Sequence, residues 1–388
     1  MRVLFIPFDG AVSHSIPLIA LSRMLDKAAF KTAFLLPKEK QPLAARLGLN
    51  IVDIDYQCDN RHSFRTELRA YGLFSPDVVI DDTNPITGLA TAFMKLPRAT
   101  IQRTGLFPGS VPCDPNYDFS LKFDFDMKQL PDITFMGLPQ PQKISDFFNA
   151  DYKIVPSVPS IEQLPPSLID DPTYVFSGPL LLEDYTIEHF IASSSRAEGH
   201  FAALERFFAE HAHRRRIYIT FGIVAKAGQQ ILSCMRRLIR QKTAVVTNIE
   251  VDGLSAEEGR YYFYAPYLPM NYVCENVDLM IHQCGSGTYH YPILHRLPMI
   301  TIGTRKYDRD GVARRLQELG VSTHLKAPEE RADFEEEFQQ TVERYYASDG
   351  ELAARMRQRM VALNEEISRT AAAFNLEAIL QKAVKRVG

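Results

Sequence analysis

Short apolar runs alternate with amphipathic stretches over the first hundred residues of the chain. Val3–Pro7 is an unbroken apolar run of the kind that forms a buried strand, and the apolar positions after it repeat at helical spacing. Further strands are predicted at Thr32–Leu36, Ile51–Ile54, Asp77–Ile80 and Ala99–Gln102, with helices between them. Strands that alternate with helices predict a parallel sheet with both faces covered.

A second alternating series begins after Arg214–Arg216, and prolines cluster between the two series, from Phe107 to Pro166. That middle segment is expected to be rich in loops. Two consecutive series predict an α/β protein with two doubly wound domains facing each other across a cleft. The strands predicted for the second series are Ile217–Phe221, Ala244–Asn248, Tyr261–Ala265, Leu279–His282, Met299–Ile302 and Ser322–Leu325, followed by charged helices from about Asp333.

Composition narrows the classes of function. The 388 residues carry a formal net charge of −3 and are 46% hydrophobic. This composition excludes a disordered chain, and the balanced charge argues against nucleic acid as the main partner. The apolar run at the N-terminus is too short for a signal peptide, so a cytoplasmic location is expected. The five cysteines are scattered, which indicates neither a disulfide framework nor a zinc site.

The clearest candidate for chemistry is the segment 281–303, in which a small-residue turn follows a predicted strand. Backbone amides in such a turn, together with the start of a helix, favour an anion such as a diphosphate. His282 adds an imidazole, and Ser286 and Thr288 add hydroxyl groups. A plain strand-to-helix turn is the alternative, but it accounts only for the glycines.

Several motifs resemble family-1, UDP-glycosyltransferase-like enzymes of the GT-B fold. Those enzymes carry a donor signature of the form His-x-x-x-Asn/x-Ser/Gly-Thr, Gly-x-Pro and Asp-Gln-x-x-Asn-Ala-x-Arg, preceded by Trp/Tyr-x-Pro, Ser-Phe-Gly-Ser and Gly-Pro-Leu. The similarity spans most of the chain and is dense from Tyr261 to Arg315. The matching segments are His282–Thr288, Leu297–Pro298, Asp308, Ala313–Arg315, Tyr267–Pro269, Thr220–Gly222 and Ser177–Leu180.

The resemblance implies two Rossmann-like domains, with the acceptor bound by the first and the nucleotide-sugar by the second. The expected boundaries are an acceptor domain at 1–180, a linker at 181–213 and a donor domain at 214–365. Residues 366–388 are expected to form a helix that packs back on the first domain.

Within the first domain, the stretch Phe8–Pro17 resembles the family's Gly-His-x-x-Pro segment. The resemblance makes His14 the general base that takes the proton from the acceptor, and a neutral imidazole suits that task. The family places an aspartate near Asp81 and Asp82 that hydrogen-bonds this histidine. Spacing slightly favours Asp82, and Asp81 remains open. The implied reaction is an inverting transfer from a nucleotide-diphosphate sugar.

In the second domain the resemblance assigns the leaving diphosphate to His282 and to the amides of Ser286, Gly287 and Thr288. Gly222, Asp308 and Arg309 complete the expected donor site, although Arg309 stands where the family has Gln and His290 where plant members have Glu. The chain contains no Trp. Tyr267 occupies the position at which many members stack a Trp on the base.

The implied scheme needs no metal and no cofactor beyond the sugar nucleotide, whose base is expected to be uridine or thymidine. The triplets Asp124–Asp126 and Asp53–Asp55 have the spacing of a metal motif, but an ordinary strand or loop explains them better. The expected acceptor is a small molecule of the natural-product type. A basic face at Arg236–Arg240 is interpreted as solvated rather than membrane-bound. Two alternatives stay open: a non-catalytic sugar-nucleotide-binding homologue or partner activator, and a 2-epimerase of the same fold.

Overall fold

The computed structural model divides into two compact units, Met1–Leu182 with Ile367–Gly388, and Glu183–Glu366. Each unit is described by itself. Within some helices only the backbone is described, as for Asp308. The residues described are 1–8, 12–56, 62–108, 134, 137–138, 144–183, 197–222, 228–305, 307–347 and 350–387.

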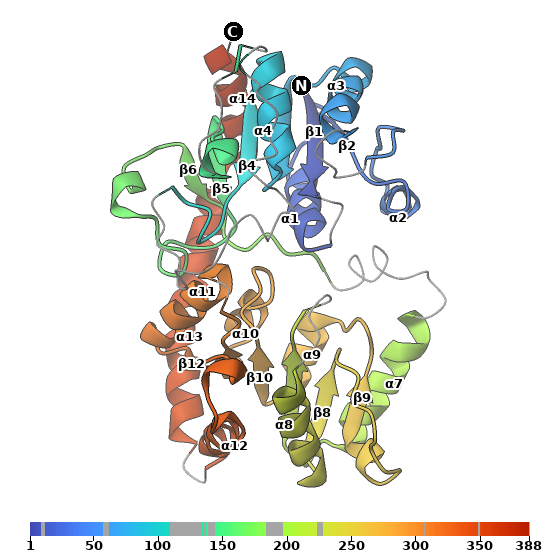
Figure 1. The fold of residues 1–388 in the computed structure, drawn as a ribbon, viewed down its shortest axis with the longest axis vertical. Helices are drawn as coiled ribbons and strands as arrows, with labels where there is room; N and C mark the ends of the chain where they lie inside the picture. The colour runs from blue at the N-terminus through green and yellow to red at the C-terminus, as the bar shows by residue number, and fades with distance from the viewer. Residues whose placement is uncertain are drawn as a thin grey trace. The chain divides into compact units, whose positions relative to one another are not determined.

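The first unit is built on a six-stranded parallel sheet in the order β2-β1-β3-β4-β5-β6 (Figure 1). The sheet is covered by helices, and α14 (Leu376–Val387) packs on β3 and β4. The strands are β1 Arg2–Pro7, β2 Lys31–Phe34, β3 Val78–Asp82, β4 Arg98–Ile101, β5 Tyr152–Val155 and β6 Tyr174–Phe176; the other helical segments are α1 Val12–Arg23, α2 Gln41–Arg46, α3 His62–Phe74, α4 Pro85–Met94, η4 Ile144–Phe148 and η5 Pro166–Leu168.

The second unit repeats this plan with a parallel sheet in the order β12-β11-β10-β7-β8-β9. Its strands are β7 Arg216–Thr220, β8 Ala244–Thr247, β9 Tyr262–Tyr264, β10 Leu279–His282, β11 Met299–Ile302 and β12 Ser322–Leu325. Its helical segments are α7 Ala197–Glu210, α8 Gln229–Arg240, η6 Glu258–Tyr261, α9 Met270–Asn276, α10 His290–Leu294, α11 Tyr307–Glu318, η7 Pro328–Glu330, α12 Phe334–Tyr345 and α13 Glu351–Ala373, whose last residues belong to the first unit.

Both sheets have a point at which the strand order reverses. In the first unit the chain goes from β1 to β2 on one side and then to β3 on the other, so the reversal lies between β1 and β3. In the second unit it lies between β7 and β10. Ligands of doubly wound sheets bind at the carboxyl ends of the strands that flank this point. No helix in the described part of the chain is long and apolar enough to cross a membrane.

Two details of the predicted strands are wrong. The strand expected at Ile51–Ile54 makes only one bridge, from Ile51 to Phe34, and the chain bends directly after it. β2 is therefore the edge strand of the sheet. β5 lies inside the segment expected to be rich in loops, Phe107–Pro166, and β6 follows that segment; neither strand was predicted, and both belong to the same sheet. β5 stands among the clustered prolines, directly before Pro156, and β6 has only three residues, so neither shows the pattern of a strand.

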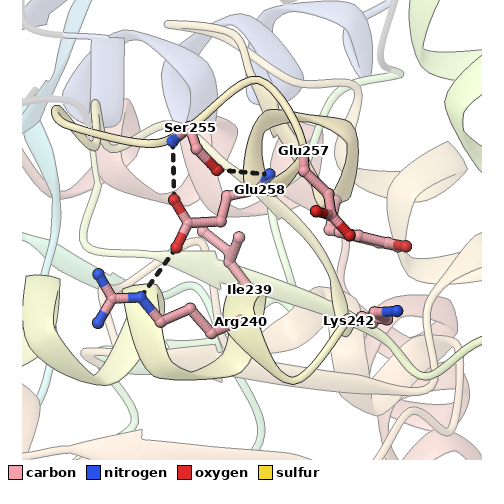
Figure 2. Close-up of a pocket in the computed structure, with 7 residues that line it drawn as sticks. Ile239, Arg240, Lys242, Ser255, Glu257 and Glu258 are labelled. Carbon is pink, nitrogen blue, oxygen red and sulfur yellow. Dashed lines mark hydrogen bonds and ion pairs between the residues drawn. The ribbon is translucent and has the colours of Figure 1, made fainter.

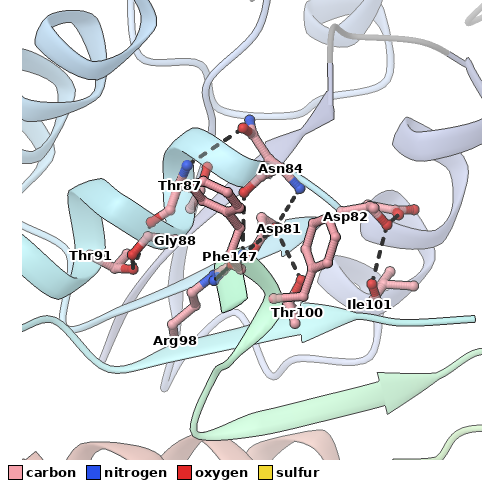
Figure 3. Close-up of polar contacts among 12 residues, drawn as sticks. Asp81, Asp82, Asn84, Thr87, Gly88, Thr91, Arg98, Thr100, Ile101 and Phe147 are labelled. Atoms are coloured by element: carbon pink, nitrogen blue, oxygen red, sulfur yellow. Dashed lines mark hydrogen bonds and ion pairs between the residues drawn. The ribbon is translucent and has the colours of Figure 1, made fainter. Parts of the chain in front are cut away.

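A buried ion pair ties β3 to β4 (Figure 3). Arg98 donates from Nε and Nη2 to the two oxygens of Asp81, at 2.7 and 3.0 Å, and both side chains are almost completely buried. Thr100 Oγ1 adds a third donor at 3.1 Å, and Arg98 Nη1 donates to the carbonyl of Phe147 at 2.6 Å. Because every partner is satisfied, the pair offsets much of the cost of removing two charges from water.

Replacing Arg98 should therefore strongly destabilise the first unit. Arg98→Met leaves the Asp81 carboxylate buried without its cation, which should lower the free energy of unfolding by about 3–5 kcal/mol. Urea denaturation followed by circular dichroism measures this loss. The control is Lys38→Met, which removes an exposed pair with Asp53 at 2.7 Å and should leave the midpoint nearly unchanged. Equal midpoints for the two variants would contradict the importance of the buried pair.

Candidate functional site

At the strand reversal of the first unit, a histidine lies against a buried carboxylate. His14 is in the first turn of α1, which follows β1, and Asp82 is the last residue of β3. The two strands pair in parallel, with Pro7 opposite Asp82. His14 Nδ1 lies 3.1 Å from Asp82 Oδ1. The two atoms are in contact, but their alignment is not that of a well-formed hydrogen bond. The His14 side chain is 22% exposed and that of Asp82 is fully buried.

The charge on Asp82 is stabilised by its neighbours. Burial by itself raises the pKa of this carboxyl, but the Arg103 guanidinium and then His14 outweigh burial and hold the pKa well below its ordinary value. Asp82 is therefore ionised at neutral pH. Asp81 does not contact His14; its oxygens are taken by Arg98, Thr100 and a backbone amide. The two adjacent aspartates thus have different surroundings.

A second buried carboxyl, Glu67 on α3, supports the same region. Tyr56 and Tyr71 donate hydroxyl hydrogen bonds to it, each at 2.7 Å, and Thr87 donates at 3.0 Å. Asn84 Nδ2 in turn donates to the hydroxyl of Tyr56 at 2.7 Å. Burial raises the pKa of Glu67 to about 7, although these hydroxyl donors act in the opposite direction.

Asn84 joins this cluster to the turn after β3. Its backbone N–H donates to Asp81 at 2.9 Å, and its side-chain oxygen accepts from the N–H of Ile86, which caps α4. Its carbonyl accepts from Arg98 at 3.3 Å. Between Asp82 and Asn84, Thr83 has a φ of +57°, a conformation that costs about 1–2 kcal/mol for an L residue. The hydrogen bonds on either side hold this turn, and with it Asp82.

In the second unit, neutral polar groups gather where β7, β8 and β10 end. Gly222 follows β7 with a φ of +79°, and a Cβ there would meet Gln283, which follows β10, at 3.2 Å. Asn248, which follows β8, donates from its side chain to the Gly222 carbonyl at 3.1 Å. Gly222 itself therefore lies close to Gln283 at the strand reversal, the place at which doubly wound sheets bind ligands.

The expectation that the His282 imidazole meets a diphosphate is not supported by this geometry. The side chain is fully buried, and burial lowers the pKa of His282 to about 3, so the ring is neutral. Nδ1 accepts the backbone N–H of Cys284 at 3.0 Å, and Nε2 faces the sulfur of Met299 at 3.4 Å. Both nitrogens are thus directed at internal groups. His282 shapes the turn, and Cys284 enters it with a φ of +57°.

The turn leaves fewer backbone amides available than the sequence suggests. The N–H of Thr288 donates to the Gly285 carbonyl at 2.8 Å, so this amide closes the turn and is not directed outward. Ser286 is half-buried and Gly287 is exposed, and neither N–H has an internal partner among the described residues. The helix that follows, α10, has only five residues and adds little dipole. Of the three amides expected to meet an anion, those of Ser286 and Gly287 are therefore the two that the turn does not use itself.

The remaining predicted donor residues lie on neighbouring loops of the same unit. Tyr267 is half-buried in the segment between β9 and α9, and Arg309 is half-buried near the start of α11. The side chain of Asp308 lies outside the described residues. A residue that the sequence did not single out, Asp310, accepts the N–H groups of Thr304 and Arg305 at 2.8 and 2.9 Å. It braces the loop between β11 and α11.

No cluster of three or more metal-binding side chains occurs in the part of the chain that the structure describes. The triplet Asp124–Asp126 lies outside that part. In the other triplet, Asp53 pairs with Lys38 Nζ at 2.7 Å and Asp55 accepts the Lys38 backbone N–H at 2.9 Å. These contacts account for the carboxylates of the second triplet without a metal.

A cavity of about 260 Å³ in the second unit lies at the amino ends of the strands, opposite the end at which the strand reversal would bind a ligand (Figure 2). Lys242 lies just before the start of β8 and Glu258 just before β9, so the cavity is at the end of the sheet where those strands begin. Glu258 accepts from Arg240 Nε at 2.9 Å and from the Ser255 N–H at 2.7 Å. The position argues against a donor site here. The lining residues are Ile239, Arg240, Lys242, Ser255, Glu257, Glu258 and Tyr261.

Two doubly wound parallel sheets on one chain, each with polar residues at its strand reversal, define the GT-B class of fold. No protein-family model matches the chain, and no curated protein matches its sequence. Solved structures do match over almost the whole length. Spinosyn forosaminyltransferase SpnP is similar with a TM-score of 0.70 at 15% identity, covering 99% of both chains.

The calicheamicin glycosyltransferase CalG4 matches with a TM-score of 0.65 at 16% identity, covering 98% of each chain. Spinosyn rhamnosyltransferase SpnG complexed with thymidine diphosphate has a TM-score of 0.62 at 16% identity, covering 96% of this chain and 98% of that one. The chain has the GT-B fold of these glycosyltransferases, which confirms the fold predicted from its motifs.

The buried Glu67 cluster predicts a pH dependence of stability. Because the folded-state pKa of about 7 lies above the ordinary 4.5, the folded protein binds the proton more tightly. The free energy of unfolding should therefore fall as the pH rises from 4.5 to about 7, by about 3 kcal/mol at most. Urea titrations of the wild type and of Glu67→Gln at several pH values measure the difference between the two slopes. Parallel pH profiles for the two proteins would contradict this assignment.

Proposed function

We propose that this protein is an inverting glycosyltransferase that moves a sugar from a nucleotide-diphosphate sugar to a hydroxyl, or another nucleophile, of a small-molecule acceptor. The observation that carries the proposal is the contact between His14 and the ionised Asp82 at the strand reversal of the first unit. A partly exposed imidazole held by a buried carboxylate is the arrangement of a general base.

In the proposed reaction, His14 removes the proton of the acceptor hydroxyl with Nε2, while Nδ1 faces Asp82. The acceptor oxygen forms a bond to the anomeric carbon as the bond from that carbon to the diphosphate oxygen breaks, with inversion. The positive charge that develops on the imidazole is balanced by Asp82, which stays ionised. The nucleoside diphosphate leaves with the bonding electrons, and no metal takes part in this scheme.

The second unit is proposed to bind the donor. The N–H groups of Ser286 and Gly287, which have no internal partner among the described residues, would stabilise the charge of the leaving diphosphate. Gly222 permits a close backbone approach, and Tyr267 offers an aromatic face to the base. Asp308 and Arg309 at the start of α11 are proposed to contact the sugar. Because SpnG is described in complex with thymidine diphosphate, thymidine and uridine nucleotides are the first donors to test.

The first unit is proposed to bind the acceptor. Phe8 lies edge-on to His14, with ring centroids 5.6 Å apart. Phe8 and Phe64 also pack against a buried group that includes Phe147 and Leu106. One apolar side chain, Phe8, therefore lies against the proposed base and joins it to an apolar cluster, which suits an apolar acceptor. The acceptors named for CalG4 and the spinosyn enzymes make natural products the first class to screen.

Removing the proposed base should abolish transfer. His14→Ala is expected to lower the rate of sugar transfer by about 10²–10⁴-fold, because general-base catalysis contributes that much. Product formation is measured by mass spectrometry, with uridine and thymidine diphosphate sugars and a panel of small-molecule acceptors. Ser13→Ala, an exposed neighbour in the same helical turn, serves as the control and should keep the wild-type rate.

If His14→Ala transferred sugar at the wild-type rate, the proposed role of His14 would be wrong. If the wild type bound sugar nucleotides but transferred none across the panel, a non-catalytic binding protein would be favoured. Conversion of the donor sugar to its 2-epimer would instead favour the epimerase alternative.

Loss of the aromatic face in the second unit should weaken nucleotide binding. Tyr267→Ala is expected to reduce the affinity for thymidine or uridine diphosphate by about 1–3 kcal/mol, the contribution usual for a stacked base. Isothermal titration calorimetry measures the dissociation constant. Tyr264→Ala is the matched control, because Tyr264 is 38% exposed on β9. A Tyr267→Ala affinity equal to that of the control would rule out stacking on this residue.

A further inference from the structure

Asp82 has a second partner that the proposed reaction does not use. Arg103 donates to both of its oxygens, from Nη1 to Oδ1 at 2.6 Å and from Nη2 to Oδ2 at 2.7 Å. Thr83 Oγ1 also donates to Oδ1, at 2.9 Å. The Arg103 side chain is only 11% exposed, so this fork is largely shielded from water. Parallel two-point contacts of this kind fix the plane of a carboxylate.

The register of the sheet explains how Arg103 reaches Asp82. Asp81 is opposite Thr100 on β4, and Asp82 is opposite Ile101. Side chains alternate between the two faces of a strand, so residues of the same parity share a face. Arg98 and Thr100 therefore lie with Asp81, whereas Arg103, two residues beyond Ile101, lies with Asp82.

The two arginines do different work. Arg98 links Asp81 to the carbonyls of Phe147 and Asn84, and so holds β3, β4, η4 and the turn before α4 together. That link does not involve Arg103. Arg103 instead grips the one carboxylate that contacts His14, at a position just beyond the end of β4. Its two-point contact therefore acts on the carboxylate beside His14 and not on the link between those segments.

While the His14 imidazole is neutral, it cannot by itself keep the buried Asp82 carboxylate ionised. While His14 awaits a proton it brings no positive charge to Asp82, and a buried carboxylate without a counter-charge takes up a proton instead. A guanidinium carries its charge at all relevant pH values. Arg103 can therefore keep Asp82 ionised in both protonation states of His14, and an ionised Asp82 favours the tautomer with the proton on Nδ1, the nitrogen 3.1 Å from its Oδ1.

We infer that Arg103 is a positioning residue: its two-point grip fixes the charge and orientation of Asp82, and through Asp82 it fixes the Nδ1–H tautomer of His14, leaving Nε2 free to accept a proton. The inference rests on the proposed function in one respect, since it assigns His14 the role of base. The chain of contacts itself runs from Arg103 through Asp82 to His14 and needs no substrate.

The test reads the tautomer directly. With ¹⁵N-labelled histidine, the chemical shifts of the two ring nitrogens show which one carries the proton in the neutral imidazole. The chain has 10 histidines, and the His14 signals are identified by their absence from His14→Ala. Wild type is expected to show the Nδ1–H tautomer. Asp82→Asn, which removes the carboxylate charge, should lose this tautomer and defines the signal of an uncoupled ring.

Arg103→Gln removes the charge and should shift the His14 signals to those of Asp82→Asn. Arg103→Lys keeps the charge but grips only one oxygen, so it should give signals intermediate between the two. Near-ultraviolet circular dichroism establishes which variants are folded. Wild-type His14 shifts in either folded variant would overturn the inference, and if Arg103→Gln did not fold, Arg103→Lys would decide alone.

The experiment separates the inference from the proposed function. If the Arg103 variants change the tautomer but His14→Ala still transfers sugar, the positioning is real and His14 is not the base. If His14→Ala is inactive but the Arg103 variants keep the wild-type tautomer, the base is right and the positioning role is wrong. Where both hold, Arg103→Lys should lower kcat while the KM for the donor stays unchanged.

Discussion

The end of β3 is the constraint on which the first unit depends. Two adjacent aspartates leave the strand on opposite faces, and each is fully buried and held by its own arginine. Buried carboxylates need counter-charges, and the register with β4 supplies them on both faces. One face thereby fastens the sheet to the segments around it, and the other presents a carboxylate to His14. The same short stretch serves both the fold and the proposed chemistry.

The sequence predicted the fold well where strands alternate regularly with helices. Leu279–His282, Met299–Ile302 and Ser322–Leu325 were each predicted with the bounds that the structure has. Strands that alternate with helices in this way are typical of parallel sheets covered on both faces. β6 has only three residues, and Ile51–Ile54 has the composition of a strand without a full set of partners. Whether such a short segment forms a strand depends on its partners in the sheet, and the residues of the segment alone do not show which partners it has.

The site was less accessible to prediction, for a related reason. Spacing could only weakly separate Asp82 from Asp81, because the choice depends on which face of β3 each side chain occupies. Nothing in the sequence marks Arg103 as a site residue. It reaches Asp82 because Ile101, two residues before it, is opposite Asp82, and this register between β3 and β4 cannot be read from a single sequence. For His282 the motif indicated the turn correctly, but the direction of the ring depends on contacts with Met299 and Cys284.

The two strand reversals differ in electrostatics in a way that fits the proposed chemistry. In the first unit a full ion pair keeps Asp82 charged, which a base needs because the proton it accepts creates a new charge beside it. In the second unit the described groups near the reversal are neutral: Gly222, Gln283, Asn248 and the turn at Ser286. Neutral amides bind an anion by directed N–H dipoles, whose strength does not depend on a titrating side chain. Because burial keeps His282 neutral, this side chain adds no pH dependence to the proposed binding of the donor.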